Sequence, residues 1–191
     1  ACYNNLASLY CDTHRFADGE QMYNSALEIY KRLMGENSFI YGQRLANCLF
    51  GLANSQVKQE KYSQAYQCFK RNIPLLKTIY RSDKNNYTEL LKSILVSQSF
   101  YSIFEKQYVE AEIYSKEALE VDSTKHVAYS NLAAALLFQG KYQEAEKIYR
   151  QYKSELKETF FSDFEEFSKA GVIPKNREED VERIKQLLLK E

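Results

Sequence analysis

The strongest constraint on the fold is a pattern of apolar and small residues that occurs four times along the chain. One small position of this pattern falls at residues 19, 65, 111 and 145, so the copies are separated by 46, 46 and 34 residues. A unit of this length cannot bury its apolar face alone, and neighbouring units must therefore stack on one another. We expect a solenoid, an architecture that offers surfaces for binding more often than it performs chemistry.

The copies differ in clarity, and helical spacing relates the apolar residues within each of them. The fourth copy is the cleanest and consists of Leu132, Ala133, Gly140, Tyr142, Ala145 and Tyr149. The first has Leu6, Ala7, Tyr10, Phe16, Gly19, Tyr23 and Ala26, and the second has Leu52, Ala53, Tyr62, Ala65 and Phe69. The third keeps only Tyr108, Ala111, Ala118 and Leu119. With only 6 glycines and 2 prolines in 191 residues, the chain is predicted to be helical throughout.

The spacing predicts four helical hairpins in an array over residues 1–158, with units at about 1–38, 39–85, 86–122 and 123–158. The expected helix pairs are 2–13 with 17–34, 39–59 with 62–80, 87–105 with 108–121, and 125–139 with 142–157. Pro74 should kink its helix or end it early, because proline removes a backbone donor. The polar residues 82–86 are expected to form a loop.

The C-terminal segment, residues 159–191, departs from the repeat and is predicted to form capping helices. Its first part carries a dense aromatic face made of Phe160, Phe161, Phe164 and Phe167. Two pairs, Ser162 with Glu165 and Asn176 with Glu179, have the spacing of capping boxes and predict two helix starts. Val181, Ile184 and Leu188 would line one side of the last helix.

The repeated residues resemble the tetratricopeptide repeat family over about residues 2–153, most closely in the fourth copy. The resemblance implies an all-α, right-handed α-α superhelix of four hairpins closed by the C-terminal helical cap. The 46-residue steps are similar to the long-helix repeats of the kinesin-light-chain-like type. The third copy departs from the family pattern at Gln98, Ser102 and Ser115, so its first helix is expected to pack differently.

In this family the first helix of each hairpin lines an inner groove that holds a peptide or helix of a partner. Carried onto this sequence, the candidate groove residues are Asn4, Ser8, Asn47, Phe50, Asn54, Lys58, Val96, Phe100, Phe104, Asn131 and Phe138. The asparagines would contact a ligand backbone. Apart from Lys58, the cations that some family members use to clamp a terminal carboxylate are missing, which argues against a chaperone-tail clamp.

Two interpretations remain open for the apolar part of this groove. Exposed apolar residues such as Phe100, Phe104 and Phe138 are typical of a docking surface for a partner. Alternatively, the aromatic segment 160–167 of the same chain covers them. In that second case the usable site moves to Asn4, Asn47, Phe50 and Asn54.

The sequence indicates no catalytic centre, so we expect no enzyme activity, no cofactor and no metal site. His14 and His126 fall at a turn and at a helix start, and no cysteine or carboxylate stands at metal-ligand spacing from them. The four cysteines form no CxxC pair and are expected to be small packed residues. Lys and Arg equal Asp and Glu at 26 each, which argues against a nucleic acid as partner.

We therefore expect a noncatalytic scaffold for protein–protein interaction whose partner is a protein or peptide. The alternative is a regulatory or sensory segment of a longer protein whose effector part precedes Ala1, because the chain enters a repeat immediately. Self-association through the first hairpin is a third hypothesis. The sequence contains no run of about 18 apolar residues, so it predicts no membrane span. The thiols favour a cytoplasmic location.

Overall fold

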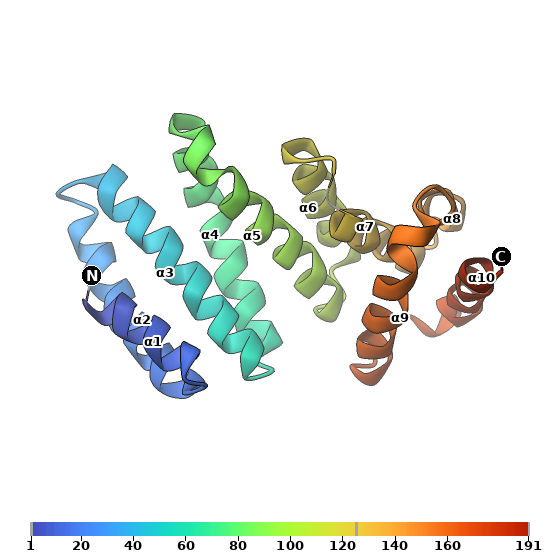
Figure 1. Cartoon of the computed structure of the whole chain (residues 1–191), viewed down its shortest axis with the longest axis horizontal. Helices are drawn as coiled ribbons and strands as arrows, with labels where there is room; N and C mark the ends of the chain where they lie inside the picture. Colours follow the sequence, from blue (N-terminus) through green and yellow to red (C-terminus); the bar gives the residue numbers. More distant parts are fainter. Residues whose placement is uncertain (1, 125, 191) are drawn as a thin grey trace. The chain divides into compact units, whose positions relative to one another are not determined.

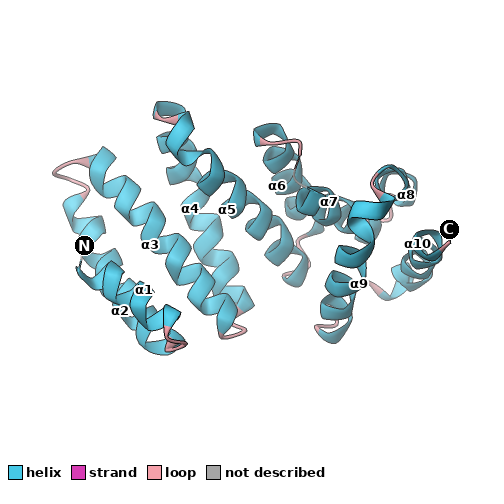
Figure 2. Cartoon of the chain, in the orientation of Figure 1, coloured by secondary structure: helices cyan, strands magenta, loops and turns pink. Residues whose placement is uncertain are grey.

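The computed structural model describes residues 2–124 and 126–190, without the side chains of residues 38 and 39. The described residues contain ten α-helices and no strand (Figures 1 and 2). The chain divides within one helix into two compact units, residues 1–94 and 95–191, and each is described by itself. This architecture is an all-α helical solenoid, as the repeat predicts.

The first unit consists of two hairpins and the beginning of a third. Its helices are α1 (Cys2–Asp12), α2 (Phe16–Leu33), α3 (Ser38–Lys58), α4 (Tyr62–Ser82) and the first half of α5 (Lys84–Phe104). Helix α1 packs on α2, α2 on α3, and α3 on α4 (Figure 1). The aromatic and small residues of the repeat make the core, where Tyr23, Phe69, Ala7 and Ala53 are buried.

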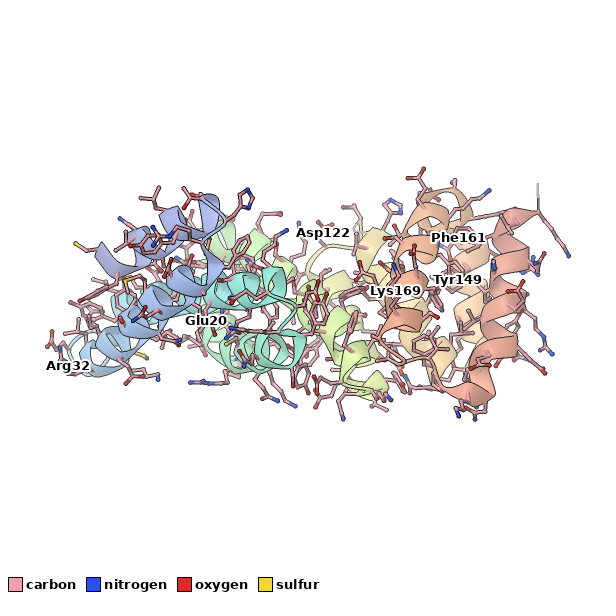
Figure 3. All side chains as sticks on the ribbon, turned by 90° about the horizontal axis from the view of Figure 1, so that it is seen from below. Glu20, Arg32, Asp122, Tyr149, Phe161 and Lys169 are labelled. Carbon is pink, nitrogen blue, oxygen red and sulfur yellow. The ribbon has the colours of Figure 1, made fainter. Side chains whose placement is uncertain are left out.

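The second unit holds the other half of α5 with α6 (Tyr108–Val121), α7 (His126–Phe138), α8 (Tyr142–Gln151), α9 (Lys153–Lys169) and α10 (Glu178–Leu189). A short 3-10 helix, Lys175–Arg177, precedes α10. The predicted helix start at Lys125 lies outside the described residues. Tyr149 is fully buried at the centre of this unit, with its ring edge-on to Phe160 at 5.4 Å (Tyr149 is labelled in Figure 3).

Each first helix of a hairpin ends in the same turn. One residue enters the left-handed region, and the next N–H bonds back to the carbonyl five residues before it, which is the Schellman arrangement. The left-handed residues are His14, Glu60, Lys106, Gly140 and Gly171, with φ of 60°, 58°, 56°, 83° and 63°. The turn at Gly171 ends α9, so the first helix of the segment predicted as a cap ends as the first helices of the repeats do.

A largely enclosed carboxylate links neighbouring hairpins in both units: Glu20, which is half-buried, and Glu112, which is buried. In the first unit Glu20 of α2 accepts hydrogen bonds from Lys61 at 2.7 Å and from Gln56 and Gln59, each at 3.1 Å (Glu20 is labelled in Figure 3). In the second unit Glu112 of α6 accepts from Lys141 at 2.6 Å and Gln139 at 2.9 Å. Both glutamates directly follow the small residue of the repeat, at positions 19 and 111, so the link recurs with the pattern.

Three local predictions are wrong in whole or in part. At Pro74 the early end is wrong, because helix α4 runs through the proline to Ser82, and Ile73, Leu76 and Ile79 around it are all buried. The kink expected there stays a prediction. The loop expected at 82–86 shrinks to Asp83, because its carboxylate caps the next helix by accepting from the N–H of Asn86 at 3.3 Å. The helix expected over 142–157 ends at Gln151.

The break after Gln151 also removes a predicted helix start. Tyr152 leaves the helical conformation, with φ −118° and ψ 37°, and its ring stacks on Tyr129 of α7 at 4.2 Å. Helix α9 then begins at Lys153 and continues through Ser162, so Ser162 is not a cap. Asn176 is not a cap either, because it lies inside the 3-10 helix before α10.

Candidate functional site

In the second unit, α9 covers the apolar residues that were predicted to line the groove. Phe167 of α9 contacts Phe100 and Phe104 of α5, with ring centroids 5.4 and 5.5 Å apart. It also contacts Phe138 of α7 at 5.8 Å, and Phe164 lies 5.6 Å from the same ring. The aromatic segment of the chain therefore occupies this apolar surface, as the second interpretation of the sequence supposed.

Helix α7 is enclosed on nearly all sides. Ten of its thirteen residues, Ala128 and 130–138, are buried, including Phe138 and Asn131. The amide of Asn131 donates to the carbonyl of Val96 at 3.0 Å and to the hydroxyl of Ser99 at 2.7 Å, which ties α7 to α5. Asn131 thus makes a contact inside the unit and presents no surface to a ligand in this structure.

In the first unit, the corresponding helices keep polar side chains at the surface. Ser8 of α1 is exposed, and so are Asn47, Asn54 and Lys58 of α3. Asn4 is half-buried, and its side-chain oxygen has no hydrogen-bond partner among the described residues. Phe50 is half-buried beside Phe69 of α4, with 6.2 Å between ring centroids. These six residues are the predicted groove positions that belong to the first unit, whereas Val96, like Phe100 and Phe104, belongs to the second and is half-buried.

The sequence reasoning missed Arg44, which is exposed on α3 one turn before Asn47. Its spacing to Asn47 and Lys58 is 3 and 14 residues, which places the three on one face of a helix. This periodicity was visible in the sequence and could have identified it. Arg44 is thus a second cation on the face of α3 that ends at Lys58.

Gly51 allows a close approach at this surface. A Cβ atom on Gly51 would lie 2.5 Å from the ring and hydroxyl of Tyr23, so the Tyr23 side chain of α2 packs directly on the backbone of α3 here. Burial, followed by the nearby Cys11 and Cys48 thiols, raises the pKa of the Tyr23 phenol to about 12. The phenol therefore remains neutral and acts as a packing group at the base of the α1–α3 surface.

Two of the cysteines, Cys48 and Cys68, are buried packing residues, and both histidines lie at the surface. Burial raises the pKa of Cys48 to about 12 and also raises that of Cys68, which keeps both as unreactive thiols. His14 and His126 are exposed, and their rings contact Phe16 and Tyr152, respectively. The surface of the first unit can thus offer hydrogen bonds, two cations and a phenylalanine edge to a ligand.

Comparisons with known proteins identify the repeat. A family model described as tetratricopeptide repeat matches residues 1–78, and a second with the same description matches residues 127–151. The two matches together cover just over half of the chain, and both are consistent with the kinesin-light-chain-like type. No curated protein matches the chain. A search of the described helices finds none with the length and apolar character needed to cross a membrane.

Tetratricopeptide repeats generally mediate protein–protein interaction, typically without catalysis. The matched segments coincide with the helices whose small and aromatic residues form the two cores, and the hairpin turn recurs along the described chain. The chain is a helical solenoid that belongs to the tetratricopeptide repeat family.

Proposed function

We propose that the chain is a noncatalytic scaffold that binds a peptide or helix of a partner protein through the first unit. The site consists of Asn4 and Ser8 of α1 with Asn47, Phe50, Asn54 and Lys58 of α3. The observation that carries this proposal is the contrast between the units: Phe167 covers Phe100 and Phe104, while the matching face of α3 stays open to solvent.

Each side chain would have a distinct role in binding. The amides of Asn47 and Asn54 offer a donor and an acceptor to the backbone of an extended ligand. The exposed edge of Phe50 would bury apolar surface of the ligand, at about 25 cal/mol per Å² before the costs of association. The four free thiols support a reducing, cytoplasmic location for such an interaction.

A second candidate rests on the outer face of α1. Tyr3, Leu6 and Leu9 are exposed by 45%, 36% and 57%, whereas Leu49 and Leu52, which match Tyr3 and Leu6 in the second hairpin, are buried. This face would support either self-association through the first hairpin or a regulatory segment of a longer protein whose effector part precedes residue 1. Gel filtration over a range of concentrations separates these, because only self-association makes elution depend on concentration.

Selection from a random peptide library displayed on phage tests the main proposal with the whole chain as bait. Peptides selected on the chain should lose binding to the Asn47→Ala, Asn54→Ala double variant. The same peptides should still bind Phe104→Ala, because Phe104 contacts α9 in the second unit. Binding that depends on Phe104 and ignores both asparagines would contradict the proposed site.

A further inference from the structure

Helix α6 lacks the large buried side chain that the other second helices of the repeats carry. One position of the repeat, separated by the same 46, 46 and 34 residues, holds an aromatic residue in three hairpins: Tyr23 in α2, Phe69 in α4 and Tyr149 in α8. All three are buried, and in α6 the same position is Ser115. The buried residues of α6 are small or polar: Ala111, Glu112, Ser115 and Ala118. Burial of apolar surface therefore contributes less to the attachment of α6 than to that of α2 or α4.

The large apolar side chains of α6 lie at or near the surface instead. Val109 and Ile113 are exposed by 60% and 49%. The others are partly buried: Tyr108, Tyr114, Leu119 and Val121. An amphipathic helix normally turns its large apolar residues toward the core. Helix α6 turns small and polar residues inward, so little of its own apolar surface is lost to water when it separates from the unit.

Two buried polar side chains of the third hairpin have no hydrogen-bond partner among the described residues. They are the Ser115 hydroxyl of α6 and the Gln98 amide of α5, which lacks a partner on both its nitrogen and its oxygen. Both residues are fully buried. Gln98 takes the position of Leu52 and Leu132 in the second and fourth hairpins. A buried polar group without a partner costs free energy, because it has given up its hydrogen bonds to water.

Hydrogen bonds to one carboxylate hold α6 where the apolar core does not. Glu112 accepts from Lys116 and Lys141, each at 2.6 Å, and from Gln139 at 2.9 Å. Gln139 and Lys141 belong to the turn between α7 and α8, so these two bonds join α6 to the next hairpin. The Glu112 side chain is only 11% exposed, and charge-assisted hydrogen bonds are stronger than neutral ones.

We propose that α6 opens locally and that the Glu112 carboxylate is the latch that keeps it closed. In the open state α6 leaves α7, on which it packs, while the core of α7, α8 and α9 around Phe160 stays folded. Segments with few buried apolar contacts are the ones that open at a lower free energy than global unfolding. This inference goes beyond the proposed function, because it concerns a moving part of the second unit and not the binding surface of the first.

Hydrogen–deuterium exchange of the full chain, at urea concentrations below the unfolding transition, tests the local opening. The amides of α6 should exchange at least about tenfold faster than the slowest amides of α7. Their rates should also depend less on urea, because opening one helix exposes less surface than unfolding the unit. Equal protection and equal urea dependence of α6 and α7 would mean that α6 opens only with the whole unit, which overturns the proposal.

Two variants separate the latch from the general stability of the unit. Glu112→Gln should speed exchange of α6 about tenfold, the scale of hydrogen bonds to a charged group. Phe160→Leu weakens the contacts of that ring with Tyr149 and Phe164, so it should speed the slowest amides of α7 and α9. It should leave α6 unchanged, since those contacts persist when only α6 opens. Unchanged exchange of α6 in Glu112→Gln, or faster exchange of α6 in Phe160→Leu, would contradict the latch.

A third variant should act in the opposite direction. Ser115→Ala removes a buried hydroxyl that has no described partner, so exchange of α6 should slow about fivefold. The matched control is Ser102→Ala, at a buried serine whose hydroxyl donates to the Gln98 carbonyl at 2.7 Å, and it should not slow exchange. Exchange of α6 that is no slower in Ser115→Ala than in the control would overturn the proposal. None of these substitutions touches Asn47 or Asn54, so such a failure would leave the proposed binding site standing.

Discussion

Between about pH 4 and pH 7 the stability of the second unit should fall as pH rises, and replacing Asp163 by asparagine should remove most of this pH dependence. Asp163 lies on α9 eight residues before the left-handed Gly171, the position that leucine occupies in the first, second and fourth hairpins. Its carboxylate faces Ser130 of α7, whose hydroxyl donates to it at 3.3 Å. Burial raises the pKa of Asp163 to about 7, against the hydrogen bond from Ser130, and the charge of Glu166 raises it further.

The magnitude follows from the difference between the folded and unfolded pKa. A rise from 3.8 to about 7 corresponds to about 4 kcal/mol at 1.36 kcal/mol per pH unit. Because the carboxyl is only partly buried, we expect about 2 kcal/mol. The folded state holds a proton that the unfolded state has released, so stability falls as pH rises from about 4 to about 7 and is constant above.

Urea unfolding followed by circular dichroism at several pH values between 4 and 8 measures this effect. The urea midpoint of the parent protein should decrease as pH rises through this range. A control variant accounts for the other titrating groups. Glu158→Gln, an exposed neighbour on the same helix, provides that control and should keep the parent slope. Asp163→Asn should flatten it. An unchanged slope in Asp163→Asn would refute the reasoning about this carboxyl.

Three further predictions concern the buried tyrosine, the close approach at Gly51 and the Glu112 carboxylate. Tyr149→Ala should cost about 3–5 kcal/mol, whereas Tyr149→Phe should be neutral or stabilising, because the buried hydroxyl has no described partner; thermal melts of both decide this. Gly51→Ala should cost about 1–3 kcal/mol in urea unfolding because the added methyl clashes with Tyr23. Gly42→Ala, whose methyl would make ordinary van der Waals contacts with Leu75 and Ile79, should be neutral or stabilising, and equal effects of the two would contradict the close approach. Burial raises the pKa of Glu112, but hydrogen bonds from Lys116, Lys141 and Gln139 lower it to about 2. The ionised carboxylate should therefore add about 2 kcal/mol to the free energy of unfolding, and this amount should be lost as pH falls from 4.5 to 2. The loss of stability in acid should be smaller by that amount in Glu112→Gln.

The hairpins were predictable because their signals are local. Leucine and alanine pairs such as Leu52-Ala53 and Leu132-Ala133 mark the first helices, and Ala65 and Ala145 mark the second. The predicted bounds of α6 are those observed, and most other helix ends shift by one to three residues. These elements depend on periodicity, which the sequence displays directly.

Other features depend on tertiary contacts that the sequence does not display. No glycine or proline marks the break at Tyr152, which accompanies stacking on Tyr129. His14, Glu60 and Lys106 take the left-handed conformation without glycine, so only Gly140 and Gly171 hinted at the shared turn. For the candidate site, Phe167 could be assigned to the Phe100 and Phe104 surface only as one of two alternatives, because the sequence does not give the direction of α9.

Hydrogen–deuterium exchange with and without a saturating peptide selected on the full chain most directly tests where this protein binds its partner. The account predicts that binding slows exchange in α1 and α3 and leaves α5, α7 and α9 unchanged. Protection confined to α5, α7 and α9, with α3 exchanging as in the free chain, would contradict it.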